Sequence, residues 1–397
     1  MRVLLLNQVF HPDPQATSQY LSRLAEELVR RGHQVTVLAA RRDYENPEKE
    51  YAARETWRGV EIIRVWNLGL GHGSKRGRIL DFLSFLLAAA WRGFFLSRAD
   101  VVMALTSPPL ISVLGAFLAL RSRARFIYWV LDLNPDEAIA VGWLKSDGLP
   151  AHFLEAASRW SLHRASRVIV PDSYLRDRLV NKGIVAGKIS VIPLWAQGEI
   201  SFDLAGRERY RRQLGLEGKH VVMYAGNHTP CHPLATLVDA AAQLQNEPGI
   251  HFCFVGGGME WKRLRERAQT EHWGHATFLG YQPFEDLPGL LSSADTQMVV
   301  MGDPFVGIIH PCKVYNFLAA RRSFIYVGPE RSHVTDLIRT GGLETITASF
   351  RHGESAALAG ELRRRAQVNP APAWPENAGT AWEESVILPQ MVAVIER

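Results

Sequence analysis

The sequence is poor in cysteine and has no uninterrupted hydrophobic run long enough to cross a bilayer. Its three cysteines among 397 residues are Cys231, Cys253 and Cys312, an odd number spread far apart. They form neither a Cys-x-x-Cys metal motif nor a disulfide framework, so a reducing cytoplasmic compartment suits the chain. The apolar stretches 79–96 and 110–120 are interrupted by charges or too short, because spanning a bilayer takes about 20 apolar residues. We therefore expect no transmembrane helix.

Several catalytic signatures are also missing. There is no G-x-S-x-G nucleophile elbow, no phosphate-binding P-loop and no G-x-G-x-x-G dinucleotide fingerprint. Residues 1–15 contain too short an apolar run for a signal peptide and suit a buried first strand instead. Because the basic residues are dispersed and no nucleic-acid-binding motif occurs, we do not expect nucleic acid as a partner.

The composition is that of a folded globular protein, with 47% apolar and 21% charged residues. A chain of 397 residues exceeds what one hydrophobic core usually supports, so two domains are expected. Residues 1–200 hold 26 Lys and Arg against 19 Asp and Glu, a net charge of +7, whereas the remaining residues have a net charge of −2. This imbalance favours an anionic partner for the N-terminal half, although ordinary surface charge explains it equally well.

Strand-like and helix-like segments alternate twice along the chain. The first series of predicted strands lies at 3–6, 33–40, 61–65, 101–105, 125–131, 167–170 and 188–192, with helices between most of them. The alternation stops at 193–204, a predicted linker, and restarts with strands at 220–225, 251–255, 276–279, 296–300 and 323–327. Short connections between such elements indicate parallel sheets.

We therefore predict an α/β protein with two doubly wound, Rossmann-like domains facing across a cleft. The expected boundaries are 1–198 for the first domain, 199–375 for the second, and 376–397 for a final helix that follows a Pro-rich break at 370–375. Doubly wound sheets bind ligands beyond the carboxyl ends of their strands, which predicts where a site lies but not its chemistry.

The segment 301–320 carries the most specific indication of a ligand site. A loop rich in Gly and Pro leads from an apolar strand to a helix that should begin near Lys313. Backbone N–H groups at a helix start can bind phosphate oxygens, and a cation there is unfavourable unless an anion binds. A bound diphosphate would explain Lys313, and a side chain pointing to solvent is the alternative. We expect Asn316, one turn on, to bond a ribose or sugar hydroxyl, and Asp303 to bond a sugar hydroxyl or to cap a turn.

A second loop with Gly and Pro, 226–233, follows a predicted strand. Its candidate ligand contacts are Gly226, Asn227, His228 and His232. The two histidines are expected to donate to a phosphate, and a purely structural loop is the alternative. They lack a second pair of ligands, so no metal is expected here.

The N-terminal half supplies candidates for the acceptor side of a site. His11, Ala16 and Thr17 lie in or just after the first strand–helix connection. Asp132 follows the strand at 125–131, and a strand-end aspartate is often functional in such sheets, although helix capping competes as an explanation.

These motifs together resemble glycosyltransferase family 4, whose members have the GT-B fold, and the resemblance covers nearly the whole chain. Five segments carry it: Arg31–Val37, Asp132–Pro135, Tyr224–Asn227, Phe254–Gly257 and Pro311–Ala319. Within the family, the sequence looks most similar to bacterial surface-polysaccharide enzymes of the colanic-acid fucosyltransferase and N-acetylfucosaminyl transferase type.

The resemblance implies a retaining transfer from a nucleotide-diphosphate sugar, without a metal cofactor, to a saccharide or polyprenyl-pyrophosphate-linked acceptor. It assigns stabilisation of the diphosphate to Lys313 and to four backbone amides, those of Phe305, Val306, Gly307 and Ile308. Lys313 and Asp132 are the expected catalytic residues, and the final helix is expected to return to the N-terminal domain.

The basic N-terminal half and the apolar helix expected at 79–96 further suggest peripheral contact with the anionic inner face of the plasma membrane. Packing of this helix against the sheet is the alternative. We otherwise expect a cytoplasmic protein.

The sequence departs from the family in identifiable places. The Glu-x7-Glu pair is absent, with Asn316 at its second position and Ile308 eight residues earlier. Asn227 and Cys231 replace the usual basic residues, and Ala16 replaces a common glycine. Two alternatives therefore stay open: a nucleotide-sugar epimerase of the same fold, and a non-catalytic member that binds a sugar nucleotide.

Overall fold

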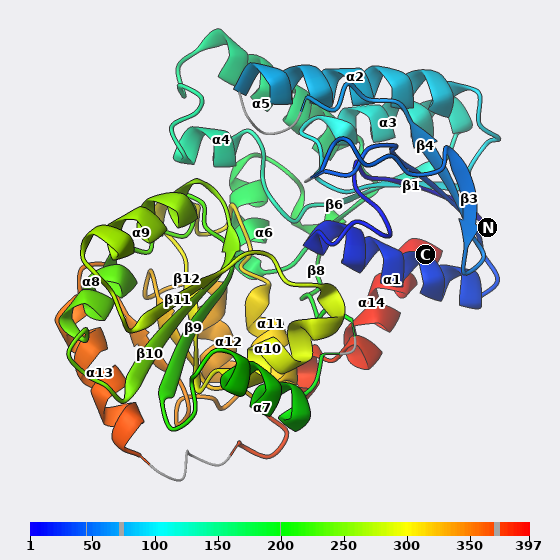
Figure 1. Ribbon diagram of the computed structural model, residues 1–397. Helices are drawn as coiled ribbons and strands as arrows, with labels where there is room; N and C mark the ends of the chain where they lie inside the picture. Colours follow the sequence, from blue (N-terminus) through cyan, green and yellow to red (C-terminus); the bar gives the residue numbers. More distant parts are fainter. Residues whose placement is uncertain (45, 71–74, 199, 369–373) are drawn as a thin grey trace. The chain divides into compact units, whose positions relative to one another are not determined.

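The computed structural model describes residues 1–44, 46–70, 75–198, 200–368 and 374–397 (Figure 1). The chain forms two compact units, each of which has its own sheet. The first unit comprises Met1–Pro193, Gly307–His310 and Ile387–Arg397, and the second comprises Leu194–Val306 and Pro311–Val386. The predicted boundary between the domains was 198/199, and the structure divides the two units after Pro193. The short segment Gly307–His310 belongs to the first unit, although the residues before and after it in sequence belong to the second.

The first unit is built on an eight-stranded sheet with the strand order β3-β4-β2-β1-β5-β6-β7-β8. Neighbouring strands run parallel except for the pair β3–β4. The strands are β1 (Arg2–Leu6), β2 (Gln34–Ala40), β3 (Arg54–Trp57), β4 (Val60–Val65), β5 (Val101–Ala104), β6 (Arg125–Trp129), β7 (Arg167–Val170) and β8 (Ile189–Val191). The sequence analysis missed β3, because its polar sequence RETW has no apolar run and pairs only at the sheet edge.

The strand order also assigns the helices to two faces of this sheet. The connection through α1 runs from β1 to β2, whereas those through α2, α3 and α5 run in the opposite direction along the sheet. Since such crossovers are right-handed, these three helices share the face opposite α1, as Figure 1 shows for α2 and α3. The helices are α1 (Ala16–Arg30), α2 (Lys75–Phe94), α3 (Ile111–Ser122), α4 (Asp136–Ala140), α5 (Leu149–Arg164), α6 (Ser173–Asn181) and the 3₁₀ turn η1 (Ala186–Lys188).

Helix α14 (Glu384–Glu396) belongs to the first unit from Ile387 onward. Its buried side chains are Ile387, Leu388, Met391, Val392 and Ile395. Arg125 on β6 donates to the carbonyl of Ile395 at 2.5 Å, and Glu396 pairs with His33 at 3.0 Å. The expected return of the final helix to the N-terminal domain is therefore observed, because its apolar face is buried there.

The second unit has a six-stranded parallel sheet in the order β11-β10-β9-β12-β13-β14. Its strands are β9 (His220–Asn227), β10 (Ile250–Gly257), β11 (Ala276–Leu279), β12 (Thr296–Val300), β13 (Phe324–Val327) and β14 (Ala348–Phe350). Its helices are α7 (Leu204–Gln213), α8 (Ala235–Gln243), α9 (Met259–Thr270), α10 (Leu287–Ser293), α11 (Lys313–Ala319), α12 (His333–Thr340) and α13 (Ser355–Gln367). Shorter 3₁₀ turns are η2 (Phe284–Asp286), η3 (Asp303–Phe305) and η4 (Thr380–Trp382).

The strand order of this sheet reverses between β9 and β12, which makes their carboxyl ends a topological switch point. Strand β9 pairs with β10 along its whole length, but with β12 only through Val222 and Met223. The last residues of β9, from Tyr224 to Asn227, therefore pair with β10 and not with β12.

Both faces of the second sheet are buried, as expected for a parallel sheet. Val222 and Tyr224 of β9 belong to the apolar cluster on one face, together with residues of α8 and α13. Val221 and Met223, which point to the other side because side chains alternate along a strand, pack with residues of α7 and α10.

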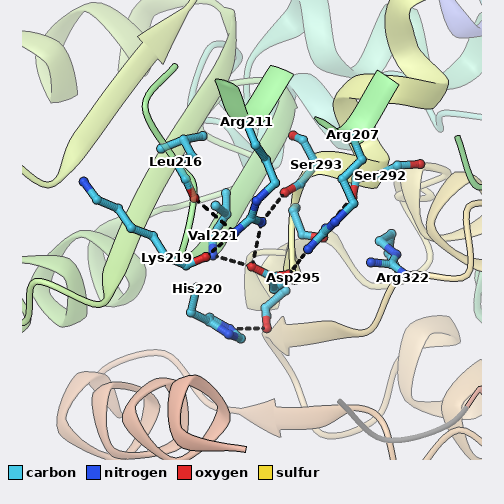
Figure 2. Close-up of polar contacts among 12 residues, drawn as sticks. Arg207, Arg211, Leu216, Lys219, His220, Val221, Ser292, Ser293, Asp295 and Arg322 are labelled. Atoms are coloured by element: carbon cyan, nitrogen blue, oxygen red, sulfur yellow. Dashed lines mark hydrogen bonds and ion pairs between the residues drawn. The ribbon is translucent and has the colours of Figure 1, made fainter. Parts of the chain in front are cut away.

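A polar network holds the opposite, amino-terminal end of this sheet together (Figure 2). The Asp295 carboxylate accepts from Arg207 at 2.6 Å, from Arg211 at 2.9 Å and from the backbone N–H of Val221 at 2.8 Å. The two arginines also donate to backbone carbonyls of Ser292 and Ser293. The network therefore ties α7 to β9 and to the end of α10, far along the strands from their carboxyl ends.

Other details of the sequence analysis change in the structure. The N-cap of α1 is Gln15, and Asp172 caps α6 by accepting from Leu175 N at 2.8 Å. Helix α7 begins at Leu204, at the end of the predicted linker. Residues 370–373 of the predicted Pro-rich break lie outside the described residues. Of the helices in the described ranges, none combines the length and apolarity that a membrane crossing requires.

Candidate functional site

Lys313, the first residue of α11, places its ammonium group against the end of β9. Its Nζ lies 3.8 Å from the centre of the Tyr224 ring. The nitrogen is buried, and no described residue accepts a hydrogen bond from it. Taking an ammonium out of water costs several kcal/mol unless an anion or acceptors compensate it, and one aromatic face supplies only part of that compensation. The side chain therefore does not point to solvent, and its position is one that an anion would stabilise.

The electrostatic state of Lys313 follows from this burial. Loss of hydration lowers its pKa to about 7, well below the value of a lysine in water. A nearby negative charge would favour the protonated form and raise the pKa again. The group is therefore poised to respond to an anionic ligand at neutral pH.

Glycines leave the space beside the ammonium group open. A β-carbon on Gly226 would lie 3.0 Å from Lys313 Nζ, and the backbone there has a φ of +130° that side chains rarely adopt. On the neighbouring strand, a β-carbon on Gly256 would lie 2.1 Å from the carbonyl oxygen of Gly226. These glycines let the ends of β9 and β10 approach each other without filling the space around Lys313.

His228 lies next to this group and is fully buried. Neither ring nitrogen has a well-formed hydrogen bond to a described residue, and the ring stands edge-on to Tyr224 with centroids 4.8 Å apart. Burial, followed by the charge of Lys313, lowers the pKa of His228 to about 4. The ring is therefore neutral at pH 7 and carries one N–H, and its donation to a phosphate stays a prediction.

His232 was predicted to donate to a phosphate, but its Nδ1–H is used in a hydrogen bond within the chain. Its Nδ1 lies 2.7 Å from the carbonyl oxygen of Val300, so Nδ1 carries the proton of the neutral ring. Burial and the Lys313 charge lower its pKa to about 3, and the remaining nitrogen, Nε2, is then an acceptor. His232 therefore positions the loop on β12, and it can donate to an anion only if that anion restores its second proton.

Two other predicted contacts are engaged within the chain. The Asn316 side chain accepts from the backbone N–H of Gln197 at 2.9 Å and is buried. Asn227 accepts a hydrogen bond from the Tyr281 hydroxyl. Asp303 is exposed at the start of η3. The ribose and sugar contacts expected of these residues remain predictions, and Asn316 would have to exchange its bond to Gln197 to make one.

The four amides expected to bind phosphate do not share one environment. Phe305 is buried, and Val306 ends the part of the loop that belongs to the second unit. Gly307 and Ile308 belong to the first unit, where the Ile308 carbonyl accepts from Leu133 N at 2.8 Å. Their predicted role as phosphate donors is untested by these contacts, which use a carbonyl and not the amides themselves.

Asp132, the catalytic candidate of the first unit, follows β6. Burial, with a smaller contribution from the charge of Glu137, raises its pKa to about 8. The pKa of Glu137 is also raised by burial. A carboxyl with such a pKa is mostly protonated at neutral pH, so Asp132 can donate a hydrogen bond where an ordinary aspartate could only accept one.

The other acceptor-side candidates lie elsewhere in the first unit. The His11 ring stacks on Trp57 with centroids 4.2 Å apart, and burial lowers its pKa, so the ring is neutral at pH 7. Ala16 and Thr17 form the first turn of α1. Nothing in their contacts tests a role in binding an acceptor.

Within the second unit, the structure thus brings Lys313, Gly226 and His228 together. It also adds Tyr224, which the sequence analysis placed in a strand and in a family motif but did not predict as a site residue. The sequence around a buried strand tyrosine does not indicate a site residue. Tyr224 becomes part of the site only through its contact with Lys313 on α11, which is distant in sequence. The same holds for Glu137 beside Asp132, since only the turn after β6 brings the two carboxyls together.

Comparison with known proteins covers both units. Residues 16–195 match the family model of the glycosyl transferase 4-like domain, and residues 206–301 match that of the glycosyl transferases group 1. A protein of Escherichia coli (strain K12) named as a colanic acid biosynthesis glycosyl transferase, WcaI, is 25% identical over 354 residues, which are 86% of each chain.

Two solved structures share the fold over the full length of this chain. Sucrose-phosphate synthase from Thermosynechococcus elongatus has a TM-score of 0.74 and 17% identity, with 98% of that chain covered. The Anabaena protein HepE in complex with UDP-glucose has a TM-score of 0.72 and 16% identity, with 99% of that chain covered.

Proposed function

Because the chain belongs to the family 4 glycosyltransferases and has their GT-B fold, we propose that it is a retaining enzyme that transfers a sugar from a nucleoside diphosphate donor to a lipid-linked saccharide. We place this reaction in the synthesis of a cell-surface polysaccharide, at the cytoplasmic face of the plasma membrane. The name of the E. coli relative refers to colanic acid biosynthesis, which supports a role in polysaccharide synthesis. The UDP-glucose bound to HepE supports a nucleoside diphosphate sugar as the donor.

One observation carries the proposal for the donor: the ammonium group of Lys313 is buried at the switch point of the second sheet, and no residue in the described ranges accepts a hydrogen bond from it. A diphosphate bound beside Gly226 would give this cation its counter-charge, and His228 would supply a neutral N–H donor. A solvent-exposed lysine would offer no such argument, because water would already satisfy it.

The chemistry assigned to this site is stabilisation of the leaving group. As the bond between the anomeric carbon and the phosphate oxygen breaks, negative charge grows on the nucleoside diphosphate. The Lys313 ammonium is fixed in place and poorly hydrated, so it stabilises this charge more in the transition state than in the bound substrate. The acceptor oxygen bonds to the same face of the sugar, and its proton passes to the departing phosphate oxygen.

We propose further that the transfer needs no metal ion, because Lys313 already supplies a positive charge for the diphosphate. Turnover should then persist in EDTA. A requirement for Mg²⁺ or Mn²⁺ that is restored by adding back the ion would contradict this part.

The test measures donor binding by calorimetry with UDP-, GDP-, ADP- and dTDP-linked sugars. The wild type should bind one nucleotide class, and Lys313→Ala should bind it much more weakly. Lys262→Ala, which removes an exposed lysine from α9 of the same unit, is the matched control and should bind like the wild type. Equal donor affinity in all three proteins would refute the assigned site.

Turnover is then measured with polyprenyl-diphosphate-linked saccharides, and NMR reports the anomeric configuration of the product. Lys313→Ala should lower turnover roughly 10²-fold or more, as the loss of a charge-stabilising group does in other enzymes. A change of the donor sugar in the absence of acceptor would instead identify an epimerase, and inversion of the anomeric centre would exclude the retaining mechanism.

A further inference from the structure

The outer surface of the first unit carries a row of exposed apolar side chains along α2. Phe85 and Ala89 are buried on the inner side of this helix. The opposite side exposes Ile79, Leu80, Leu83, Leu87, Trp91 and Phe94. Trp91 is 73% exposed and Leu87 is 72% exposed, so these side chains do not belong to the margin of the hydrophobic core.

The neighbouring helices extend this surface. Helix α3 packs against both α2 and α5, so the three form one layer on the same face of the sheet (Figure 1). Their exposed apolar residues are Phe117 and Leu120 on α3 and Leu149, Phe153 and Trp160 on α5. Leu149 is 87% exposed and Phe153 is 68% exposed. We call the exposed apolar side chains of α2, α3 and α5 the apolar face.

Soluble monomers rarely expose so many large apolar side chains on adjacent elements, because each exposed group forgoes the free energy of burial. An apolar surface of this kind marks an interaction site. The identity of the partner follows from the charges around it.

The three helices that carry the apolar face are basic. They contain six arginines and two carboxylates, Asp81 and Glu155. Asp81 accepts bonds from Asn67 and the backbone of Gly69, and Glu155 pairs with Lys182, so both acidic groups are already compensated. A second copy of the same basic surface would be repelled, whereas an anionic surface would be attracted.

Arginine–aromatic pairs place cations at the rim of the face. The guanidinium of Arg121 lies 4.7 Å from the Phe94 ring, and that of Arg164 lies 5.7 Å from the Trp160 ring. Tryptophan with basic residues at the level of its ring is the arrangement that suits the boundary between lipid headgroups and acyl chains. Because none of these helices meets the length and apolarity of a membrane span, the surface suits lying in the interface rather than crossing it.

We infer that the apolar face docks on an anionic lipid bilayer, with Leu87 and Trp91 entering the acyl region and the surrounding arginines contacting phosphate headgroups. The inference deepens the proposed function, since it rests on a lipid-linked acceptor for its purpose, but binding itself requires no turnover. Apolar burial and attraction to anionic lipid add together at such a surface, and the electrostatic part weakens with salt.

The test is flotation of the full chain with vesicles of phosphatidylethanolamine and phosphatidylglycerol, compared with vesicles of phosphatidylcholine alone. The wild type should float with the anionic vesicles, and added salt should weaken the binding. The double variant Leu87→Gln, Trp91→Gln should lose roughly tenfold or more of the bound fraction relative to free protein. Since both side chains are mostly exposed, its unfolding temperature should match that of the wild type.

The matched control is Val185→Gln, Leu204→Gln, which changes two exposed apolar residues outside the apolar face and should bind vesicles like the wild type. Absence of wild-type flotation, or equal flotation of both double variants, would overturn the inference. A wild-type dimer that the Leu87, Trp91 variant converts to monomer, without vesicle binding, would make the face an interface between copies and would likewise overturn it.

Donor binding by calorimetry separates this inference from the proposed function. A chain that binds a nucleotide sugar through Lys313 but ignores vesicles refutes only the membrane surface. A chain that binds vesicles through the apolar face but no nucleotide sugar refutes only the donor site.

Discussion

At the scale of single residues, the buried positive charge of Lys313 lowers the stability of the ligand-free protein. Its folded-state pKa of about 7 lies below that of an unfolded lysine, so keeping it protonated opposes folding at neutral pH and below. Replacement of the charge by an isosteric apolar chain in Lys313→Met should therefore raise the stability of the free protein by about 1–2 kcal/mol while weakening donor binding. Urea unfolding with and without nucleotide sugar measures both effects, and a destabilised variant would contradict this account of the site.

The same pKa predicts how donor affinity depends on pH. A bound diphosphate raises the pKa of Lys313, so binding takes up a proton above pH 7 but not below it. Affinity should be nearly constant from pH 6 to 7 and fall above that, by at most about tenfold per pH unit. Calorimetry with an intact nucleotide sugar, whose diphosphate charge stays constant over this range, reports the effect. Lys313→Met should bind weakly without this pH dependence.

Asp132 offers a test of a protonated carboxyl. If it acts as a neutral hydrogen-bond donor, Asp132→Asn keeps an N–H donor and should retain turnover within about tenfold, whereas Asp132→Ala should lose roughly 10²-fold. Wild-type turnover should also fall as the pH rises through about 8, where the carboxyl ionises, and the Asn variant should lack this fall. Equal loss in both variants would point instead to an ionised base.

At the scale of elements, the Asp295 network joins α7, β9 and α10. Burial alone would raise the pKa of Asp295, but Arg207, the Val221 N–H and Arg211 hold it below its usual value. Asp295→Asn leaves two largely buried arginines without their counter-charge and should cost about 3–5 kcal/mol. Asp239→Asn, at an exposed pair with Arg267, should change stability by less than about 0.5 kcal/mol.

Because the folded pKa of Asp295 is depressed, its contribution is present above the pKa of an unfolded aspartate, about 4, and is lost as the pH falls below that value. The difference in stability between wild type and Asp295→Asn should therefore shrink between pH 4 and pH 2. A difference that stays constant over this range would contradict the ionic origin of the effect.

Helix α14 is the second element whose role can be tested. Ile395 is fully buried in the first unit, so Ile395→Ala should cost about 2–4 kcal/mol there. Hydrogen exchange should rise in peptides from α1, β2 and β6 and stay unchanged in the second sheet. The exposed Ser385→Ala serves as control, and faster exchange in the second sheet of the Ile395 variant would contradict the assignment of this helix.

At the scale of the whole molecule, local sequence patterns predicted most of the strands and helices and the parallel type of both sheets. Apolar runs with short connections predicted both parallel sheets. The presence of a lysine in the first turn of a helix predicted that Lys313 does not point to solvent. What the pattern could not supply were contacts between distant segments. Asn316 bonds Gln197, 119 positions away, and this bond uses the amide that was expected to hold a ribose. The tautomer of His232 likewise depends on Val300, 68 positions away.

The division of the chain between its two units also has a consequence for synthesis on the ribosome. Residues Met1–Pro193 emerge before the second unit, yet the part of α14 that packs on them begins at Ile387 and emerges only after the second unit. The unit that is begun first is therefore completed last. A nascent chain stalled before Ile387 would hold a finished second unit and an unfinished first one, and its uncovered surface would be a substrate for chaperones.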